Sequence, residues 1–299
     1  MTVVTRFAPS PTGDLHLGHA YSARFARDTA AEAGGRFLIR IEDIDAGRCR
    51  AEFIERNLDD LAWLGLLPHE PPVRQSERMP LYRRALDRLD GLGVLYPCFC
   101  SRARIRAEIE AAGGAPHAAA DGTLPYPGFC RGLASERAEA LIASGAGFGL
   151  RLDVNRAFAL TGPLTWSDRR MGEQPADLRA LGDVVVARKE TPTSYHLSVV
   201  VDDAAQGVTR VTRGEDLREA TAVHRLLYAL LDLPVPVWEH HPLCLGADGR
   251  RLAKRSGAPS LRVLRAAGHS PADVLAMADQ AAGRPPSDGA TAPGVQVAR

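Results

Sequence analysis

The chain has no long apolar run, few cysteines and almost no net charge, and each of these features excludes a class of protein. None of its 299 residues belongs to a run of ~18 apolar residues, as a membrane span requires, and the N-terminus shows no secretory leader pattern. Five cysteines, an odd number, fit a reducing compartment better than a disulfide scaffold. The composition, 45% hydrophobic and 24% charged, excludes general disorder, collagen and coiled coil. We therefore expect a cytoplasmic monomer of one or two globular domains, without a membrane partner.

Lysine is nearly absent, although cations are abundant. The 37 cationic side chains balance 36 anionic ones, so the net charge of +1 gives no argument for nucleic-acid binding beyond local basic patches. Lys189 and Lys254 are the only lysines, and the other cations are arginines. Each lysine is therefore a candidate for a specific role, with chance in an arginine-biased composition as the alternative.

The first hundred residues alternate between strand and helix patterns. The predicted elements are strands at 2–7 and 36–43 and helices at 18–33, 48–64 and 80–92. A loop rich in proline and glycine follows the first strand, and the Gly34–Gly35 pair ends the first helix. This β-α-β order predicts an α/β fold with a parallel sheet.

The pattern changes after Tyr96. Residues 97–184 show no β-α alternation, which indicates an inserted smaller domain. Strand signals return at 183–190, 193–204 and 208–214, and 215–231 reads as an amphipathic helix. The expected division is a Rossmann-like domain in two halves (1–96 and 185–235), the insert (97–184), a basic loop with a short helical C-terminal region (236–280) and a loose tail (281–299).

The loop after the first strand places His16 and His19 three residues apart, with Gly18 between them. In α/β sheets, such a loop lies at the carboxyl ends of the strands, where a helix N-terminus offers N–H groups to phosphate. Two imidazoles could donate to phosphate oxygens, and the glycine would let a purine or phosphate approach the backbone. A metal-binding pair and a simple turn with two surface histidines are the alternatives.

A second loop, residues 250–257, holds four cations within six positions and is flanked by glycine. Such a loop suits a polyphosphate leaving group, and Lys254 would act there as a flexible point charge. The alternative is a solvated basic surface loop.

Three cysteines form a third constellation. Cys98, Cys100 and Cys130 could close a tetrahedral structural zinc site with one further donor. General chemistry favours His117 as that donor over Tyr126 or Asp121, and free cysteines are the alternative. Cys49 and Cys244 read as ordinary thiols.

The two loops together resemble the signatures of the class I aminoacyl-tRNA synthetases. HLGH stands at the position of the HIGH signature, within Pro9–His19, and RLAKR (Arg251–Arg255) stands at that of KMSKS. Arg251 and Ala253 depart from the second signature, whereas Lys254 keeps its second lysine. The strings RFAPSPTGDLHLGHA and RIEDID resemble the glutamyl-specific branch, over roughly residues 3–260.

The resemblance implies a Rossmann-like catalytic domain that uses ATP, with Mg²⁺. The residues implied for ATP are His16, Gly18, His19 and Lys254, of which the two histidines and the lysine would be catalytic by stabilising charge on the phosphates. Arg6 and Arg213 would clamp the glutamate side chain, Glu42 would accept its ammonium, and Tyr195 and Ser10 would supply hydroxyls. The whole glutamate set is Arg6, Phe7, Ala8, Pro9, Ser10, Glu42, Tyr195 and Arg213. Taken singly, each could form a surface salt bridge or pack in the core.

CFC followed by YPGFC resembles the glutamyl-Q tRNA(Asp) synthetases. This implies one structural Zn²⁺ per chain, held by Cys98, Cys100, Tyr126 and Cys130. About 40 residues follow the RLAKR loop, too few for the core of an anticodon-reading domain. We therefore expect activation of L-glutamate to glutamyl-adenylate and its transfer to the queuosine base of tRNA(Asp) at the wobble position. Conventional glutamyl charging of a tRNA terminus, a small-molecule nucleotidyltransferase and a non-catalytic RNA-binding protein are the alternatives.

Overall fold

The computed structural model describes residues 2–101, 103, 105, 126–177, 182–246, 249, 251, 252 and 259–284. The chain divides into two compact units. The first comprises Met1–Gln75, Val208–Glu215 and Glu239–Arg299, and the second comprises Ser76–Gly207 and Asp216–Trp238. The two units are the parts of the chain whose residues contact one another most. The domain boundaries expected from the sequence rest on composition instead, and they stay predictions. None of the helices in the described residues is long and apolar enough to cross a membrane.

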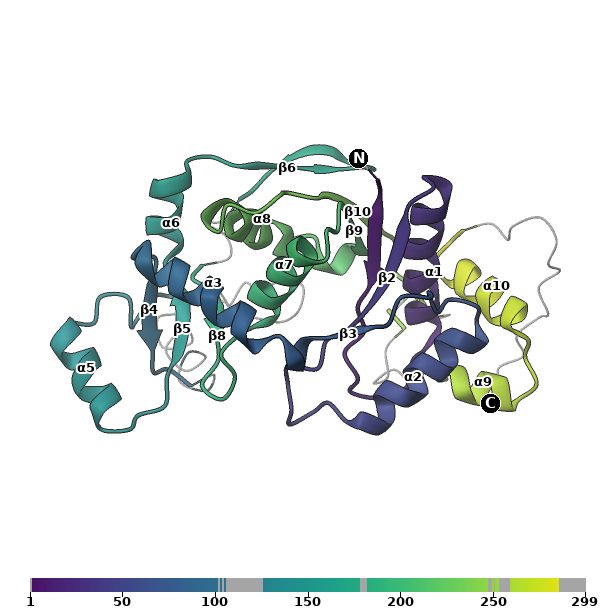
Figure 1. The fold of residues 1–299 in the computed structure, drawn as a ribbon, viewed down its shortest axis with the longest axis horizontal. Helices are drawn as coiled ribbons and strands as arrows, with labels where there is room; N and C mark the ends of the chain where they lie inside the picture. The colour runs from purple at the N-terminus through teal and green to yellow at the C-terminus, as the bar shows by residue number, and fades with distance from the viewer. Residues whose placement is uncertain are drawn as a thin grey trace. The chain divides into compact units, whose positions relative to one another are not determined.

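A parallel sheet forms the centre of the first unit (Figure 1). Its order is β1 (Val4–Phe7), β2 (Arg36–Ile41) and β3 (Val73–Arg74). The crossovers are α1 (Leu17–Glu32) and α2 (Ala51–Trp63). In register, Val4 faces Arg36 and Arg40 faces Val73. The predicted β-α-β unit and parallel sheet are confirmed.

The turn between α1 and β2 explains the glycine pair. Gly34 has φ = +59°, a left-handed conformation that ends a helix at little cost only for glycine. A Cβ on Gly35 would lie 2.0 Å from the carbonyl oxygen of Val3, so a side chain at this position would push β1 and β2 apart.

The core of the first unit lies between the sheet, α1 and two C-terminal helices. These are α9 (Leu261–Ala266) and α10 (Pro271–Ala281), which confirm the predicted helical region. Side chains from all these elements share one apolar cluster, including Phe7, Leu15, Ile39, Leu261 and Val274. α1 and α10 lie side by side (Figure 1), and Arg24 Nη1 is 2.7 Å from Asp279 Oδ2. β9 (Arg210–Gly214) also belongs to this unit.

The second unit contains an antiparallel sheet in the order β4 (Leu95–Cys98), β5 (Gly149–Leu152), β8 (Val185–Ala187). Its helices are α3 (Met79–Gly91), α5 (Ser135–Ala143), α6 (Val154–Thr161), α7 (Tyr195–Ala205) and α8 (Ala220–Leu230). A hairpin joins β6 (Thr165–Asp168) to β7 (Gly172–Pro175). β10 (Val237–His241) pairs with β6 at Trp238 and Asp168.

The strand predicted at 193–204 is wrong, because α7 occupies this segment. Ser194 caps the helix, its hydroxyl accepting from the Leu197 amide at 3.4 Å. Every residue from Leu197 to Asp203 is buried, so the helix has no polar stripe that would give a helical period. The run of valines inside it favours a strand by intrinsic propensity, and burial against the surrounding helices outweighs that preference.

Candidate active site and metal centre

His16 and His19 lie together at the N-terminus of α1. Nδ1 of His16 accepts from the Gly18 amide at 3.1 Å, and Nδ1 of His19 accepts from the His16 amide at 3.2 Å. The two ring centroids are 3.9 Å apart. Because both Nδ1 atoms accept, each neutral ring carries its proton on Nε2 and presents that atom as a donor. The pair is thus suited to phosphate oxygens, and binding of a metal through Nδ1 would compete with the helix cap.

Gly18 contacts the ring of His16 closely, a role for glycine that the sequence did not reveal. A Cβ at this position would lie 3.0 Å from Cε1 and 3.2 Å from Nδ1 of His16. A side chain there would therefore displace the His16 ring. Glycine at this position therefore leaves room for the His16 ring that caps the helix, in addition to the access to the backbone that it would give a nucleotide.

Arg6 and Arg213 converge although they are far apart in the sequence. Each is 5% exposed; Arg6 lies on β1 and Arg213 on β9. Arg6 Nη1 donates to the carbonyl of Thr212 at 2.9 Å, directly before Arg213. Arg213 Nε donates to Nε2 of His240 at 3.1 Å. Sequence reasoning missed the buried His240, since no local motif marks a contact that depends on strand register.

Glu42 and the segment Pro9–His19 are joined by backbone. The Glu42 amide, just after β2, donates to the Pro9 carbonyl at 3.1 Å. The Glu42 carboxylate lies 3.5 Å from Nη2 of the buried Arg40, so a substrate ammonium would share it with that arginine. Of the remaining glutamate candidates from Phe7 to Ser10, Phe7 and Pro9 are buried, Ala8 is half-buried and Ser10 is exposed.

Tyr195 belongs to the second unit, at the first turn of α7. Its ring centroid lies 5.5 Å from those of both His196 and His224. The two histidines are linked by Nδ1 and Nε2 at 3.2 Å. Tyr195 is therefore part of an aromatic cluster that the sequence analysis did not foresee.

The second signature is only partly described. Lys254 lies outside the described residues, together with Ala253 and Arg255. Arg251 is exposed and forms an isolated antiparallel β-bridge with Leu245. Beyond the loop, Ser260 forms a β-bridge with His16, and the Leu261 amide donates to the Leu15 carbonyl at 2.8 Å. The chain that leaves the second signature is thus tied directly to the first.

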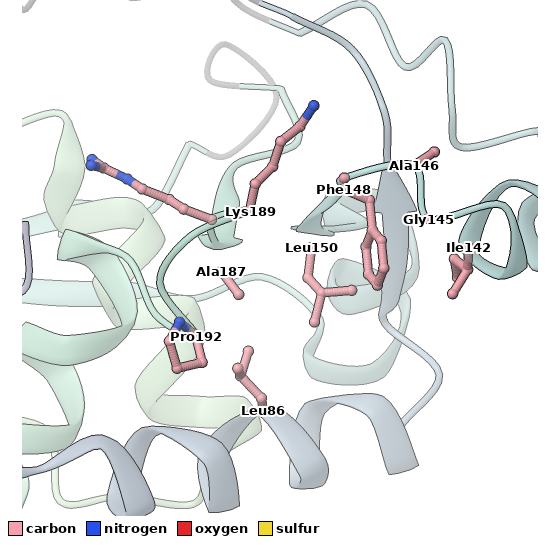
Figure 2. Close-up of a pocket in the computed structure, with 11 residues that line it drawn as sticks. Leu86, Ile142, Gly145, Ala146, Phe148, Leu150, Ala187, Lys189 and Pro192 are labelled. Atoms are coloured by element: carbon pink, nitrogen blue, oxygen red, sulfur yellow. The ribbon is translucent and has the colours of Figure 1, made fainter.

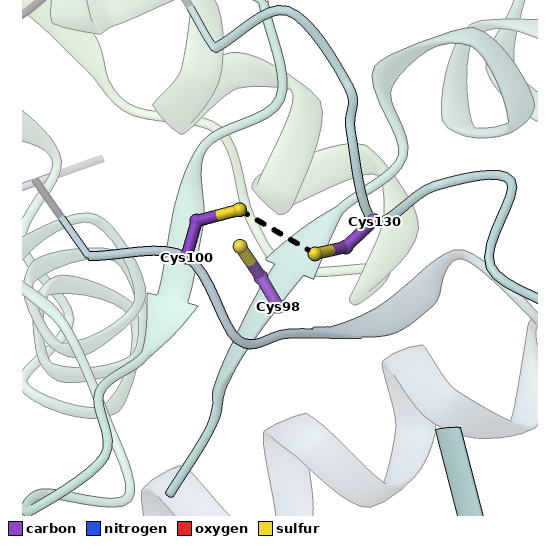
Figure 3. A group of neighbouring side chains, drawn as sticks. All are labelled: Cys98, Cys100 and Cys130. Atoms are coloured by element: carbon purple, nitrogen blue, oxygen red, sulfur yellow. Dashed lines mark hydrogen bonds between the residues drawn. The ribbon is translucent and has the colours of Figure 1, made fainter. Parts of the chain in front are cut away.

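The cysteine cluster of the second unit brings its three Sγ atoms within 4.8 Å of one another (Figure 3). The Sγ atoms of Cys100 and Cys130 are 3.5 Å apart. Tyr126 joins them, its Oη lying 3.5 Å from Cys98 Sγ and 3.6 Å from Cys100 Sγ. The Cys130 amide donates to the same Oη at 2.8 Å. His117 and Asp121, the other candidate fourth donors, lie outside the described residues.

These spacings fit a tetrahedral zinc ion. Zn–S bonds of about 2.3 Å and a Zn–O bond of about 2.0 Å place sulfur and oxygen about 3.5 Å apart, and two sulfurs about 3.8 Å apart. The cluster shows 3.5 and 3.6 Å for the first and 3.5 Å for the second. The three thiols could therefore hold a metal ion, and the Tyr126 hydroxyl lies at a distance that suits a fourth donor.

The thiols of this cluster differ in acidity. Burial raises the pKa of Cys100 to about 11, so this thiol is protonated at neutral pH without a cation beside it. Burial opposes ionisation of Cys98 too, but hydrogen bonds with Tyr126 and Arg151 outweigh it and lower the pKa. Binding of a metal would therefore release protons.

A cavity of about 430 Å³ in the second unit contains none of the predicted site residues (Figure 2). Its lining is mainly apolar and includes Leu86, Phe148, Leu150 and Pro192. Lys189 lines its edge, and in Figure 2 the side chain extends away from Leu86 and Pro192. The cavity is therefore separate from the residues predicted to bind ATP, glutamate and metal.

Comparisons with known proteins agree with these arrangements. Residues 2–280 match the family model of the tRNA synthetases class I (E and Q), catalytic domain. A protein of Rhodobacter capsulatus named glutamyl-Q tRNA(Asp) synthetase is 51% identical over 91% of this chain and 98% of its own length. A relative of the same name from Symbiobacterium thermophilum is 47% identical over 90% of this chain and 83% of its own.

A crystal structure of a glutamate tRNA ligase from Elizabethkingia meningosepticum in complex with its amino acid superposes with a TM-score of 0.72 at 30% identity. The match covers 86% of this chain and 53% of the ligase, so the chain spans about half the length of that enzyme. From residue 2 to residue 280, the chain belongs to the catalytic domains of the class I tRNA synthetases of the E and Q type.

Proposed function

We propose that this chain activates L-glutamate with ATP and transfers the glutamyl group to the queuosine base at the wobble position of tRNA(Asp). The observation that carries the proposal is the 51% identity to a glutamyl-Q tRNA(Asp) synthetase over 98% of that relative's length. The glutamate–tRNA ligases of Synechococcus sp. and Oleidesulfovibrio alaskensis are 39% and 42% identical, but the chain covers 57% and 52% of them. We further propose that it acts as a cytoplasmic monomer.

In the first step, an oxygen of the glutamate α-carboxylate attacks the α-phosphorus of ATP and releases pyrophosphate. The Nε2–H groups of His16 and His19 would donate to phosphate oxygens as charge develops on them. Lys254 would add a point charge, Gly18 would keep the backbone accessible, and Mg²⁺ would accompany the nucleotide. This is catalysis by positioning and electrostatics, because no side chain forms a bond to the substrate.

The glutamate site we propose is centred on two buried guanidiniums. Arg6 and Arg213 would hold the side-chain carboxylate, since both are fixed by hydrogen bonds to neighbouring groups. Glu42 would receive the ammonium. Tyr195 and Ser10 would supply hydroxyls. Phe7, Ala8 and Pro9, which join Arg6 to Ser10 in the sequence, would contribute their backbone to the site.

In the second step, a hydroxyl of the queuosine base attacks the carbonyl carbon of glutamyl-adenylate and AMP leaves. The hydroxyl proton is lost in this step, and an ester bond to the base is formed. The same adenylate could be attacked by a terminal ribose, so the identity of the acceptor is decided by RNA docking and not by the activation chemistry.

The metal centre we propose is one structural Zn²⁺ held by Cys98, Cys100, Tyr126 and Cys130. The donor spacings given above support it. Zinc would cross-link the end of β4 to the segment that begins at Tyr126, within the inserted domain expected at 97–184.

The decisive experiment incubates the protein with labelled glutamate, ATP and one RNA at a time: tRNA(Asp) with queuosine, tRNA(Asp) without it, and tRNA(Glu). We expect label on the first RNA alone. Label on tRNA(Glu), or equal label with and without queuosine, would assign conventional charging instead. Pyrophosphate exchange without labelled RNA would assign a small-molecule nucleotidyltransferase, and absence of exchange would remove the catalytic proposal.

A further inference from the structure

Arg151, on β5, contacts two of the four zinc donors. Its Nε donates to Cys98 Sγ at 3.3 Å, and its Cζ lies 3.8 Å from the centroid of the Tyr126 ring. One guanidinium thus gives an N–H···S hydrogen bond to a thiol and a cation–π contact to the phenol. The sequence analysis did not single out Arg151, because it stands 53 residues after Cys98 and outside the cysteine pattern.

The guanidinium is held in this position from its other side. Its Nη1 donates to the Asp183 carbonyl at 2.7 Å. The Asp183 side chain is itself engaged: Arg131 Nε donates to it at 2.7 Å, the Tyr96 hydroxyl donates to the same oxygen, and the Val154 amide donates to the other at 3.1 Å. The buried carboxylate of Asp183 therefore fixes the frame around Arg151 and is paired with Arg131.

The charge of Arg151 has no carboxylate to balance it among the residues that the structure describes, whereas Arg131 lies 2.7 Å from Asp183 Oδ2. A half-buried cation without an anion is unfavourable unless a negative group forms nearby. Three thiolates and a phenolate around Zn²⁺ carry a net charge of about −2, which would supply that negative charge. A metal-bound donor set of that charge would lie directly beside the guanidinium of Arg151, which carries the opposite charge.

We propose that Arg151 is a positioning residue of the metal centre, whose guanidinium hydrogen-bonds the ligand sulfur of Cys98, lies over the Tyr126 ring and compensates the negative charge of the donor set. The inference rests on the zinc site proposed above. Residues beyond the direct ligands commonly orient them and strengthen metal binding in this way.

The test measures metal binding, without reference to aminoacylation. Zinc affinity is determined by competition with a chromophoric chelator for the full chain and for Arg151→Met, Arg151→Lys and the control Arg156→Met. Arg156 lies on α6 in the same unit, with its side chain 70% exposed and 3.7 Å from Asp153. We expect Arg151→Met to weaken zinc binding about 10- to 100-fold. Arg151→Lys should restore part of the affinity, since it keeps the charge, and Arg156→Met should match the unaltered protein.

Substitution of Co²⁺ for zinc gives a readout that a loss of stability would not move. An N–H···S bond withdraws electron density from the sulfur, so its removal in Arg151→Met should shift the sulfur-to-cobalt charge-transfer band to lower energy. An affinity within twofold of the unaltered protein, with an unshifted band, would overturn the role of Arg151 and leave the zinc site standing.

Two further outcomes keep the inference and the metal site apart. If the unaltered protein takes up no stoichiometric zinc and shows no cobalt–thiolate band, the zinc proposal fails and the role of Arg151 fails with it, while the RNA-labelling assay still decides the function. If Arg151→Met does not fold, as judged by circular dichroism, Arg151→Lys decides, and an affinity and band equal to those of the unaltered protein would overturn the inference.

Discussion

The histidine pair of the first unit and the cysteine–tyrosine cluster of the second differ in how their side chains are held. His16 and His19 each use Nδ1 to accept from a backbone amide of the same helix turn. Cys98 and Cys100 lie against the hydroxyl of Tyr126, and each also contacts a side chain from a distant segment, Arg151 for Cys98 and Cys130 for Cys100. Four residues of sequence fix the first arrangement. The second joins segments about 30 residues apart and sets one guanidinium, that of Arg151, against three thiols. The first should tolerate removal of zinc, and the second should depend on zinc.

The largest effect expected from this difference is that of zinc removal. A strong chelator should lower the free energy of unfolding by about 4 kcal/mol, the stabilisation that a ligand gives when it is present at about 1,000 times its dissociation constant. Urea titrations with and without chelator measure this change, and readded zinc should restore it. Pyrophosphate exchange, assayed with Mg²⁺ in excess over the chelator, should fall less than tenfold, because neither His16 nor His19 is a ligand of the proposed zinc. Loss of exchange without loss of stability would contradict the comparison.

The histidine region should show the opposite behaviour, with chemistry lost and fold kept. His16→Asn retains a side chain that caps helices well but lacks the imidazole N–H. We expect pyrophosphate exchange to fall on the order of 10²-fold while the free energy of unfolding changes by less than about 0.5 kcal/mol. His16→Ala is the matched variant, and it should lose both the exchange activity and about 1 kcal/mol of stability. Equal activity of His16→Asn and the unaltered protein would show that the ring serves as a cap alone.

The local character of the first region explains why the sequence could predict it. Spacing of three residues places His16 and His19 on one helix turn, and the strand, loop and helix around them carry ordinary local signals. The parallel β-α-β unit, α3 and the C-terminal helices were predicted for the same reason. α7 was not, since its valines favour a strand and its burial leaves no helical stripe.

For the second region, the sequence predicted only a list of candidate donors, of which the structure brings Cys98, Cys100, Cys130 and Tyr126 together. Cysteine spacing indicated a metal site, but the choice of Tyr126 over His117 came from resemblance and not from chemistry. The sequence could not reveal the roles of Arg151 and Asp183. Arg151 reaches the cluster through the register of β4 against β5, and Asp183 binds Arg131, which lies 52 residues earlier in the chain. His240 was missed in the first unit for the same reason, since its partner Arg213 lies 27 residues away on another strand.

A smaller effect is expected where the backbone itself shapes the histidine pair. Gly18→Ala introduces a Cβ that would lie 3.0 Å from Cε1 of His16, so the ring must shift by a few tenths of an ångström. Pyrophosphate exchange should fall about tenfold, as small displacements of catalytic groups cost that much or more. Alanine favours helix over glycine by up to ~1 kcal/mol, so the melting temperature should stay constant or rise. Activity lost together with stability would instead indicate that the helix start is disrupted.

The smallest effect that we expect is a dependence of the free energy of unfolding on pH, which arises from a buried carboxylate of the first unit and involves no metal. Asp60 on α2 is fully buried. Among the residues that the structure describes, neither of its carboxylate oxygens has a hydrogen-bond partner. Burial raises the pKa of Asp60 to about 6. The folded state therefore binds this proton more tightly than the unfolded state, whose pKa is about 4. For this group, stability is greatest below pH 4, falls as pH rises from 4 to 6, and stays lowered above 6. The guanidinium of Arg262, with Nη1 4.0 Å from Asp60 Oδ1, offsets part of the free-energy cost of burying the ionised carboxylate.

Asp60→Asn keeps the shape of the side chain and removes the buried charge. We expect it to raise the free energy of unfolding by about 1–2 kcal/mol at pH 7 and to change it little at pH 4. The control is Asp59→Asn, because Asp59 is half exposed and its pairs with Arg262 and Arg265 lie at the surface. That variant should stay within about 0.5 kcal/mol of the unaltered protein at both pH values. Urea titrations at pH 4, 5, 6 and 7 measure the difference, and a gain at pH 4 equal to that at pH 7 would show that Asp60 is not the group that titrates.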